Sequence, residues 1–313
     1  MNWKTKANIQ RLCAALPIAG EALYYGIQRN FGSLRRGIGF KGHFATVKNC
    51  LVQLKRAGVD IRSWPSFRVF EIGTGRALGA PICFYLCGAT ELHTFDAHRY
   101  LRPELVASML GEIKAQQEAV FEMLSDVAEN RELDARLNRL SSSASTMEAF
   151  MKLADVKYYA PSDATRTNLA ASTIDLHFSD NVFEHVPPPA IGGMLSEAGR
   201  VLSKHGVACH SINPGDHSGR EDPSISSINF LQYSDTEWDK IAGNRFAYHN
   251  RLRACEYRSI YAASGHEILS WEGTVDQRGK REIESGFPVN ERFNRMSPEE
   301  LAEIKIVVVS QPS

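Results

Sequence analysis

The segment from Phe67 to Asp96 constrains the fold of this chain more than any other. It reads FRVFEIGTGRALGAPICFYLCGATELHTFD. Phe67–Ile72 is a short apolar run rich in β-forming residues, which predicts a buried strand. The glycines within residues 73–75 predict an open turn, Ala77–Cys87 predicts a helix, and Leu92–Phe95 predicts a second strand. This order is typical of an α/β sheet, in which ligands bind at the carboxyl ends of the strands.

Polar residues at the two strand ends restrict the ligand. A dinucleotide turn of the form G-x-G-x-x-G needs a third glycine, and Leu78 stands in that position. Glu71 would place negative charge beside a pyrophosphate, whereas it suits a ligand that carries an ammonium and a sulfonium. Asp96 ends the second strand, where its carboxylate can accept hydrogen bonds from ribose hydroxyls. The pattern therefore favours a positively charged nucleoside over a dinucleotide.

Three motifs in the chain resemble those of one enzyme family. The order acidic-x-Gly-x-Gly, followed by an acid at the end of the next strand, resembles motif I of the class I S-adenosylmethionine (SAM) methyltransferases. SDNVFEHV at 179–186 resembles the family segment that follows the fourth strand, with Asp175 and His185 in matching places. SEAGRVLSKHG at 196–206 resembles the end of the next helix. The resemblance spans 67–100 and 156–213 and concerns the cofactor fold, not the acceptor.

The resemblance implies an α/β fold, with a Rossmann-like, seven-stranded, mostly parallel sheet whose final strand is antiparallel. The remaining strands are expected at 156–160, 173–178, 207–212, 267–272 and 304–309. Further helices are expected at 44–57, at 190–202 with an end at Lys204–Gly206, and at 246–263.

The chain divides into three parts in this interpretation. Residues 1–62 form a helical N-terminal extension, and residues 63–313 form the SAM-binding methyltransferase domain. A helical insertion at 101–155 interrupts that domain, because its apolar residues recur at helical spacing. Two roles fit the insertion, a cap over the acceptor or a homodimer interface.

The resemblance also assigns roles around the cofactor. The turn would face the methionine part of SAM, Glu71 its ammonium, Asp96 the ribose, and Asp163 with the backbone of Ala164 the adenine. The residues expected to bind SAM are thus Glu71, Gly73, Thr74, Gly75, Asp96, Asp163 and Ala164. Asp163 has a second interpretation, since Asp in a Pro-Ser-Asp sequence also favours a simple Asx turn.

The acceptor group is expected to be a hydroxyl, with an amine or a carboxylate as alternatives. A hydroxyl acceptor would need a base, and histidine suits that role near neutral pH. His217, His185 and His249 are the candidates, and His217 with Asp216 is preferred because both follow the fifth strand. No metal is expected, although Asp216, His217 and Asp222 are an alternative divalent-metal set.

His185, Asn250 and Arg251 are expected to bind the acceptor, a small molecule or saccharide, and the arginines favour an anionic one. Alternatively, Arg251 and Arg253 pair with acids of the 221–239 segment. The pattern NPGDH…INFL…W…NRLR, between residues 213 and 253, resembles methyltransferases of bacterial surface-polysaccharide synthesis.

Composition supports a cytoplasmic enzyme without a nucleic-acid partner. The 313 residues carry 36 basic and 36 acidic side chains, although residues 1–62 hold eleven Lys/Arg against two acids. No apolar run reaches the roughly 18–20 residues of a membrane span. The six scattered cysteines predict free thiols in a reducing compartment.

Two other functions remain open at this point: an NAD(P)-dependent oxidoreductase on a Rossmann fold, and a SAM-fold module that binds without catalysis.

Overall fold

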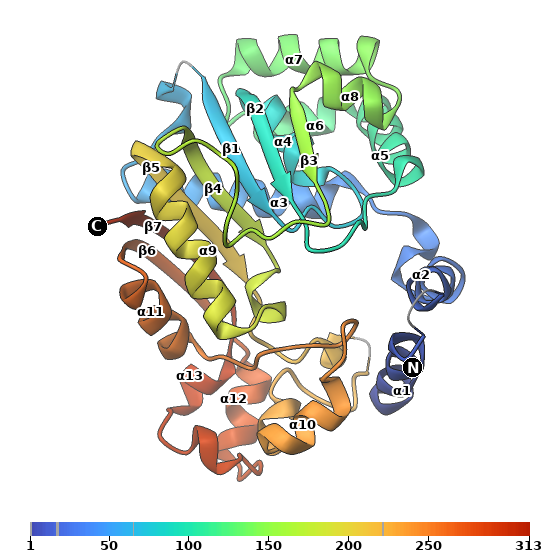
Figure 1. The fold of residues 1–313 in the computed structure, drawn as a ribbon, viewed down its shortest axis with the longest axis vertical. Helices are drawn as coiled ribbons and strands as arrows, with labels where there is room; N and C mark the ends of the chain where they lie inside the picture. Colours follow the sequence, from blue (N-terminus) through green and yellow to red (C-terminus); the bar gives the residue numbers. More distant parts are fainter. Residues whose placement is uncertain (1, 17–18, 65, 221) are drawn as a thin grey trace.

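The computed structural model describes residues 2–16, 19–64, 66–220 and 222–313, and its centre is a seven-stranded sheet in the order β3-β2-β1-β4-β5-β7-β6 (Figure 1). The strands are β1 (Phe67–Ile72), β2 (Ala89–Phe95), β3 (Val156–Tyr159), β4 (Ile174–Asp180), β5 (Leu202–Ile212), β6 (His266–Val275) and β7 (Glu303–Pro312). Strands β1 to β5 pair in parallel, and β7 pairs antiparallel with both β5 and β6. The predicted fold class is therefore confirmed, including the antiparallel final strand.

Helices make up most of the rest of the described chain. The N-terminal part contains α1 (Trp3–Ala14), α2 (Gly20–Phe31), η1 (Ser33–Arg36), α3 (Phe40–Arg56) and η2 (Ile61–Ser63). The middle contains α4 (Gly79–Leu86), α5 (Pro103–Ala115), α6 (Gln117–Leu124), α7 (Asn130–Ser143), α8 (Met147–Leu153), η3 (Phe183–His185) and α9 (Pro188–Val201). The remaining helices are η4 (His217–Arg220), η5 (Asn229–Gln232), α10 (Asp235–Ala242), α11 (Ala254–Ala263), α12 (Gln277–Glu284), η6 (Glu291–Phe293) and α13 (Pro298–Ala302).

Alternation along β1 explains why helices cover both faces of the sheet. Successive side chains of a strand point to opposite faces, so Phe67 and Val69 join a core with α3 and α4, whereas Phe70 and Ile72 join a core with α9. In Figure 1, α9 and α11 lie in front of the sheet and α3 lies behind it. The helix predicted at 44–57 is thus a packing helix of the main core.

Residues 101–155 fold into α5 to α8, as the helical spacing predicted. Their apolar face packs into the same core as α3 and α4, and Arg136 donates hydrogen bonds to the carbonyls of Tyr85 and Ala89. The division of the chain into extension, domain and insertion stays a prediction, as does a homodimer through this insertion.

Two sequence-based element boundaries are wrong. The helix predicted over 246–263 begins only at Ala254, because Arg251 has a φ of +58° and the Glu256 carboxylate accepts from the N–H of Arg253 as an N-terminal cap. The strand predicted at 207–212 begins at Leu202, directly after α9 ends at Val201, so the helix stop predicted at Lys204–Gly206 lies within β5. Residues 203–206 bulge between the pairs Ile174–Leu202 and Leu176–Val207.

The expectation of six free thiols is wrong for one pair. The sulfurs of Cys50 and Cys209 form a disulfide, because α3 packs against β5 and brings their Cα atoms within 6.3 Å. Cys13, Cys83, Cys87 and Cys255 are free. The cytoplasmic location stays a prediction, and no helix within the described ranges is long and apolar enough to cross a membrane.

Candidate functional site

The glycine turn after β1 joins the ends of three neighbouring strands. Gly73 and Gly75 have φ values of +84° and +67°, which favour glycine strongly. The N–H of Gly73 donates to the carbonyl of Phe95 at 2.8 Å, and a Cβ on Gly73 would lie 2.3 Å from Cγ2 of Val182, in the loop after β4. A Cβ on Gly75 would meet nothing within 4 Å. Gly73 is thus fixed between the end of β2 and the loop after β4, whereas Gly75 faces open space among the described residues.

Two carboxylates flank this turn. Glu71 is buried and accepts a hydrogen bond from Thr94 Oγ1 at 2.6 Å, while Thr94 also bonds the hydroxyl of Thr74. Asp96 accepts from the N–H of Gly75 at 3.0 Å. Burial raises the pKa of Glu71 to about 7 and the pKa of Asp96 to about 6. Within the described ranges neither carboxylate forms an ion pair, so the site would be completed by a ligand that brings positive charge and hydroxyl donors.

Asp163 lies in an exposed turn after β3. Its Oδ1 accepts from the N–H of Thr165 at 2.9 Å and from the hydroxyl of Thr165 at 2.7 Å, which is the Asx-turn bonding pattern. Ala164 is buried beside Phe70 and Phe95. The adenine role of Asp163 and Ala164 stays a prediction.

A cavity of about 250 Å³ lies between the N-terminal helices and the loops after β4 and β5. It is lined from the N-terminal side by Trp3, Lys6, Ala7, Gln10 and Tyr24, and from the other side by His185, Asp216, His217, Ser218, Trp238, Ile241, Ala242, Phe246, Ala247 and His249. The three histidines considered as bases are thus brought together here, although they come from separate parts of the sequence. No described residue of 101–155 lines this cavity, so the structure gives no support to a cap role for the insertion.

The N-terminal helices are fixed over this cavity by specific contacts. The N–H of Trp3 donates to Asp222 Oδ2 at 3.0 Å, and Gln10 Nε2 donates to the carbonyl of Phe246 at 3.0 Å. On α2, Glu21 pairs with Arg102 at 3.0 Å. Sequence reasoning missed this wall, because helical spacing in residues 1–62 does not reveal which distant loops those helices contact.

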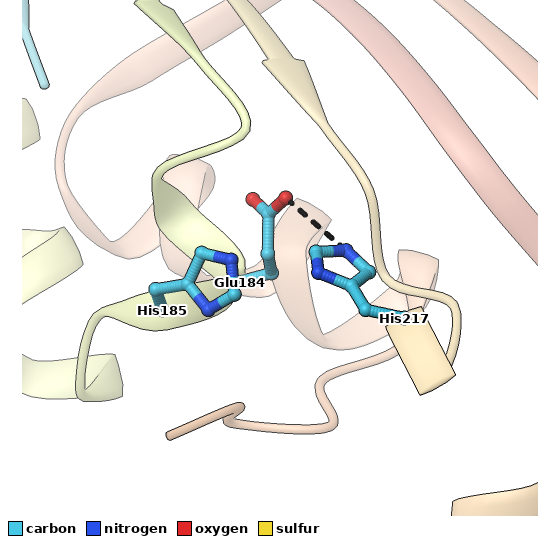
Figure 2. A group of neighbouring side chains, drawn as sticks. All are labelled: Glu184, His185 and His217. Atoms are coloured by element: carbon cyan, nitrogen blue, oxygen red, sulfur yellow. Dashed lines mark ion pairs between the residues drawn. The ribbon is translucent and has the colours of Figure 1, made fainter. Parts of the chain in front are cut away.

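The histidines surround a buried acid that the sequence analysis did not single out. Glu184 is 0% exposed, and neither of its carboxylate oxygens has a hydrogen-bond partner among the described residues. Its Oε1 lies 3.8 Å from Nε2 of His217. Figure 2 shows the Glu184 carboxylate between the rings of His185 and His217. One ligand atom from each of these three residues lies within 4.8 Å of the others.

The histidine rings contact one another edge to face. The centroid of His217 lies 5.1 Å from that of His185 and 5.3 Å from that of His249. Burial lowers the pKa of His217 to about 3 and lowers the pKa of His249 well below its usual range, and it raises the pKa of Glu184 to about 8. His217, His249 and Glu184 are therefore uncharged near pH 7. A bound cation would favour the ionised form of Glu184.

Asp216, paired with His217 in the sequence-based mechanism, has its own bonds. Its Oδ1 accepts from the N–H of Ser218 at 2.8 Å, and its Oδ2 accepts from Asn229 Nδ2 at 3.1 Å. Its bonding is therefore that of an Asx turn at the cavity wall. The alternative metal set of Asp216, His217 and Asp222 does not form in the described ranges, since Asp222 accepts from Trp3 and Ser224 instead.

Asn250 connects two loops of the protein rather than facing the cavity. Its Nδ2 donates to the carbonyls of Phe183 and Val186 at 2.7 and 2.9 Å, and its backbone N–H donates to the carbonyl of Glu184 at 2.9 Å. Asn250 therefore holds the segment that carries Glu184 and His185, and it has no free donor for an acceptor molecule.

Arg251 and Arg253 are also directed into the protein. Arg251 is 1% exposed and donates to the carbonyls of Phe230 and Tyr233, and it pairs with Asp235. This matches the alternative interpretation of Arg251 and contradicts its expected contact with an acceptor. Arg253 is 0% exposed and donates to backbone carbonyls instead of an acid.

Comparisons with known proteins identify similar folds. No family model matches the chain, and no curated protein matches it. Among solved structures, one similar chain is the magnesium protoporphyrin IX methyltransferase of Synechocystis PCC 6803 with bound SAH, at 15% identity over 87% of this chain and 84% of that one, with a TM-score of 0.43. Another is the geranyl diphosphate C-methyltransferase of Streptomyces coelicolor A3(2), at 10% identity over 86% and 81%, with a TM-score of 0.45.

A third is a SAM-dependent methyltransferase of Methanosarcina mazei, at 10% identity over 80% of this chain and 94% of that one, with a TM-score of 0.45. All three are methyltransferases, the class that the sequence motifs resemble.

Proposed function

We propose that this chain is a SAM-dependent methyltransferase that acts on a small-molecule acceptor in the histidine-lined cavity. The observation that carries the proposal is the turn of Gly73 and Gly75 between the buried carboxylate of Glu71 and the half-buried carboxylate of Asp96. The open space at Gly75 lets a ligand approach the backbone, Glu71 suits an ammonium, and Asp96 suits ribose hydroxyls. These residues fit SAM.

The chemistry follows from that placement. SAM, when bound, supplies a methyl group on a sulfonium, which a nucleophile displaces in line to leave a thioether. The protein contributes position and exclusion of water. The cavity wall offers the aromatic side chains of Trp3, Tyr24, Trp238 and Phe246 together with histidines, a mixture typical of small-molecule sites. His217, which the sequence analysis preferred as the base for a hydroxyl acceptor, lies at this wall, and its Nε2 has no hydrogen-bond partner among the described residues.

A saccharide hydroxyl remains the acceptor that we propose, because aromatic faces and polar side chains together suit a sugar ring. The expectation of an anionic acceptor was based on Arg251 and Arg253. Both are buried and donate hydrogen bonds within the protein, so they do not favour an anion in the cavity.

The oxidoreductase alternative is disfavoured by two residues. Leu78 is 0% exposed at the start of α4, so the place where a dinucleotide turn needs a third glycine is filled by core packing. Glu71 is buried near the end of β1, two residues before the turn, where its negative charge would repel a pyrophosphate.

Replacement of Asp96 tests the cofactor. Asp96→Ala is expected to weaken SAM binding at least about tenfold, the loss of one charge-assisted hydrogen bond or more. Isothermal titration calorimetry with SAM, NAD and NADP measures this directly. Asp134→Ala is the matched control, because Asp134 is exposed on α7 of the insertion and should leave affinity unchanged. Unchanged SAM affinity in folded Asp96→Ala, or tighter binding of NAD than of SAM, contradicts the proposal.

SAM binding should also depend on pH. The pKa values of Glu71 and Asp96 are raised to about 7 and about 6, so both groups hold protons in mildly acidic solution and must lose them to bind an ammonium or two hydroxyls. Affinity is therefore expected to rise at least about tenfold between about pH 5.5 and about pH 7.5. Titration calorimetry across this range measures the slope, and Glu71→Gln should reduce it to the part that Asp96 contributes. A flat profile for the wild-type protein would count against ionised carboxylates in the site.

A further inference from the structure

We propose that Glu184, His185 and His217 form a site for one divalent transition-metal ion at the wall of the cavity. The three residues come from the loops after β4 and β5, and their ligand atoms lie within 4.8 Å of one another. Atoms bound to one zinc ion at about 2.0–2.2 Å lie roughly 3–4 Å apart, so small side-chain rotations bring this set to bonding distance.

The unpartnered carboxylate is the strongest observation. A buried carboxylate normally has hydrogen-bond donors or a cation beside it. Glu184 is 0% exposed, and neither oxygen has a partner in hydrogen-bond geometry among the described residues. The backbone N–H groups of Glu184 and Asn213 offset the effect of burial on its pKa only in part. Oε1 of Glu184 lies 3.8 Å from Nε2 of His217, which also has no hydrogen-bond partner among the described residues. A metal ion between the two would satisfy both atoms.

The orientation of His185 also fits a metal ligand. Its Nδ1 lies 2.8 Å from the carbonyl of Tyr248, so Nδ1–H donates and Nε2 keeps its lone pair for a ligand bond. Histidines that bind metals usually donate their other N–H to a carbonyl or carboxylate, which fixes the ring. Asn250 supports the same segment through the carbonyls of Phe183 and Val186.

His249 differs from His185 in which ring nitrogen carries the proton. Its Nδ1 accepts from the N–H of Arg251 at 3.1 Å, so its Nε2 carries the proton and is a donor without a partner. It is therefore not a ligand in this arrangement, but its ring contacts His217 and His185 on the cavity side.

The donor set also indicates the class of metal. Two imidazoles and one carboxylate suit zinc, iron, cobalt or nickel, whereas magnesium prefers oxygen ligands alone. His185 is exposed, and both His185 and His217 line the cavity, so ions and acceptors can reach the site. A three-residue set leaves coordination positions open on that side.

The role of the metal rests on the proposed function. A metal with an open position toward the cavity would polarise an acceptor oxygen and ease the loss of its proton to water. The oxygen would then form its bond to the methyl carbon while the carbon–sulfur bond breaks and sulfur keeps the electron pair. In this arrangement His217 holds the metal and does not remove the proton itself.

Metal binding tests the site without an acceptor. Tag-free, chelator-treated protein is titrated with Zn²⁺, and with Co²⁺ to follow its visible absorption. We expect one ion per chain, and we expect Glu184→Gln and His217→Ala to weaken binding at least about a hundredfold, the upper limit for loss of a residue that only supports a ligand. Glu184→Gln keeps the shape of the side chain and breaks no side-chain hydrogen bond among the described residues, so it should fold. Mg²⁺ should not compete.

Two control variants distinguish this site from the alternative metal set that includes Asp216 and from other histidines of the chain. Asp216→Asn should keep wild-type Zn²⁺ affinity, and so should His205→Ala, since His205 is exposed on β5. Loss of Zn²⁺ in Asp216→Asn, no bound metal in the wild-type protein, or unchanged affinity in both ligand variants would overturn the proposal. SAM affinity is measured on the same samples. Metal without SAM binding would refute the methyltransferase proposal alone, and SAM without metal binding would refute this site alone.

Discussion

Gly73→Val is expected to reduce SAM affinity by at least about a hundredfold, to the limit of calorimetric detection. Any Cβ at this position would lie 2.3 Å from Cγ2 of Val182. Val182 is β-branched and rotates little, so the loop after β4 would have to move, and the cofactor turn would move with it. The positive φ of Gly73 adds strain that a β-branched residue tolerates poorly.

Gly58→Val provides the matched control for that experiment. Gly58 has a φ of +85°, nearly the same as that of Gly73, but a Cβ there would meet nothing within 4 Å. The control should lose some stability and keep its SAM affinity. Thermal melts of both variants show whether each is folded. Wild-type SAM affinity in folded Gly73→Val would mean that the cofactor binds elsewhere.

Arg253→Ala is expected to lower the free energy of unfolding by about 3–5 kcal/mol. The guanidinium is 0% exposed and donates to the carbonyls of Pro214 and Leu301, which lie far apart in the sequence. Removal leaves buried carbonyls without donors and a cavity beside Phe230. Burial lowers the pKa of Arg253 to about 10, so the group stays charged near neutral pH.

Urea unfolding measures this loss, with Arg258→Ala as the control on α11, the helix that begins directly after Arg253. Arg258 is exposed and stacks on Trp271 at 3.9 Å, so its removal should cost no more than about 1 kcal/mol. Equal losses in the two variants would show that the bonds of Arg253 contribute little. An unfolded Arg253→Ala protein would be followed by Arg253→Lys, which keeps the charge but loses the second donor group.

The sequence predicted the parts of the fold whose signals are local. The strand at Phe67–Ile72 matches β1, because β-forming residues and the glycine turn lie next to each other in the chain. Asp96 and the turn could be placed together from the rule that parallel strands end at one edge. The side-chain roles at this edge stay predictions, since no ligand contact tests them.

The acceptor region could not be predicted in the same way, because its contacts join distant segments. Arg251 stands in a helix-forming sequence, yet the carbonyls that it binds belong to Phe230 and Tyr233. Glu184 was visible within VFEHV, but only the fold shows that its carboxylate lies beside His217 and lacks a partner. Likewise, no spacing rule connects Cys50 on a helix with Cys209 on a strand.

The position of β7 has a consequence for the order in which the chain can fold during synthesis. β6 pairs only with β7 in the described sheet, and β7 comes after it in the sequence. While residues 266–275 emerge from the ribosome, they therefore have no strand to pair with, and the edge of β5 is open to other chains. The sheet can close only when residues 303–312 have been synthesised and inserted between these two strands, so β7 is the strand that completes it.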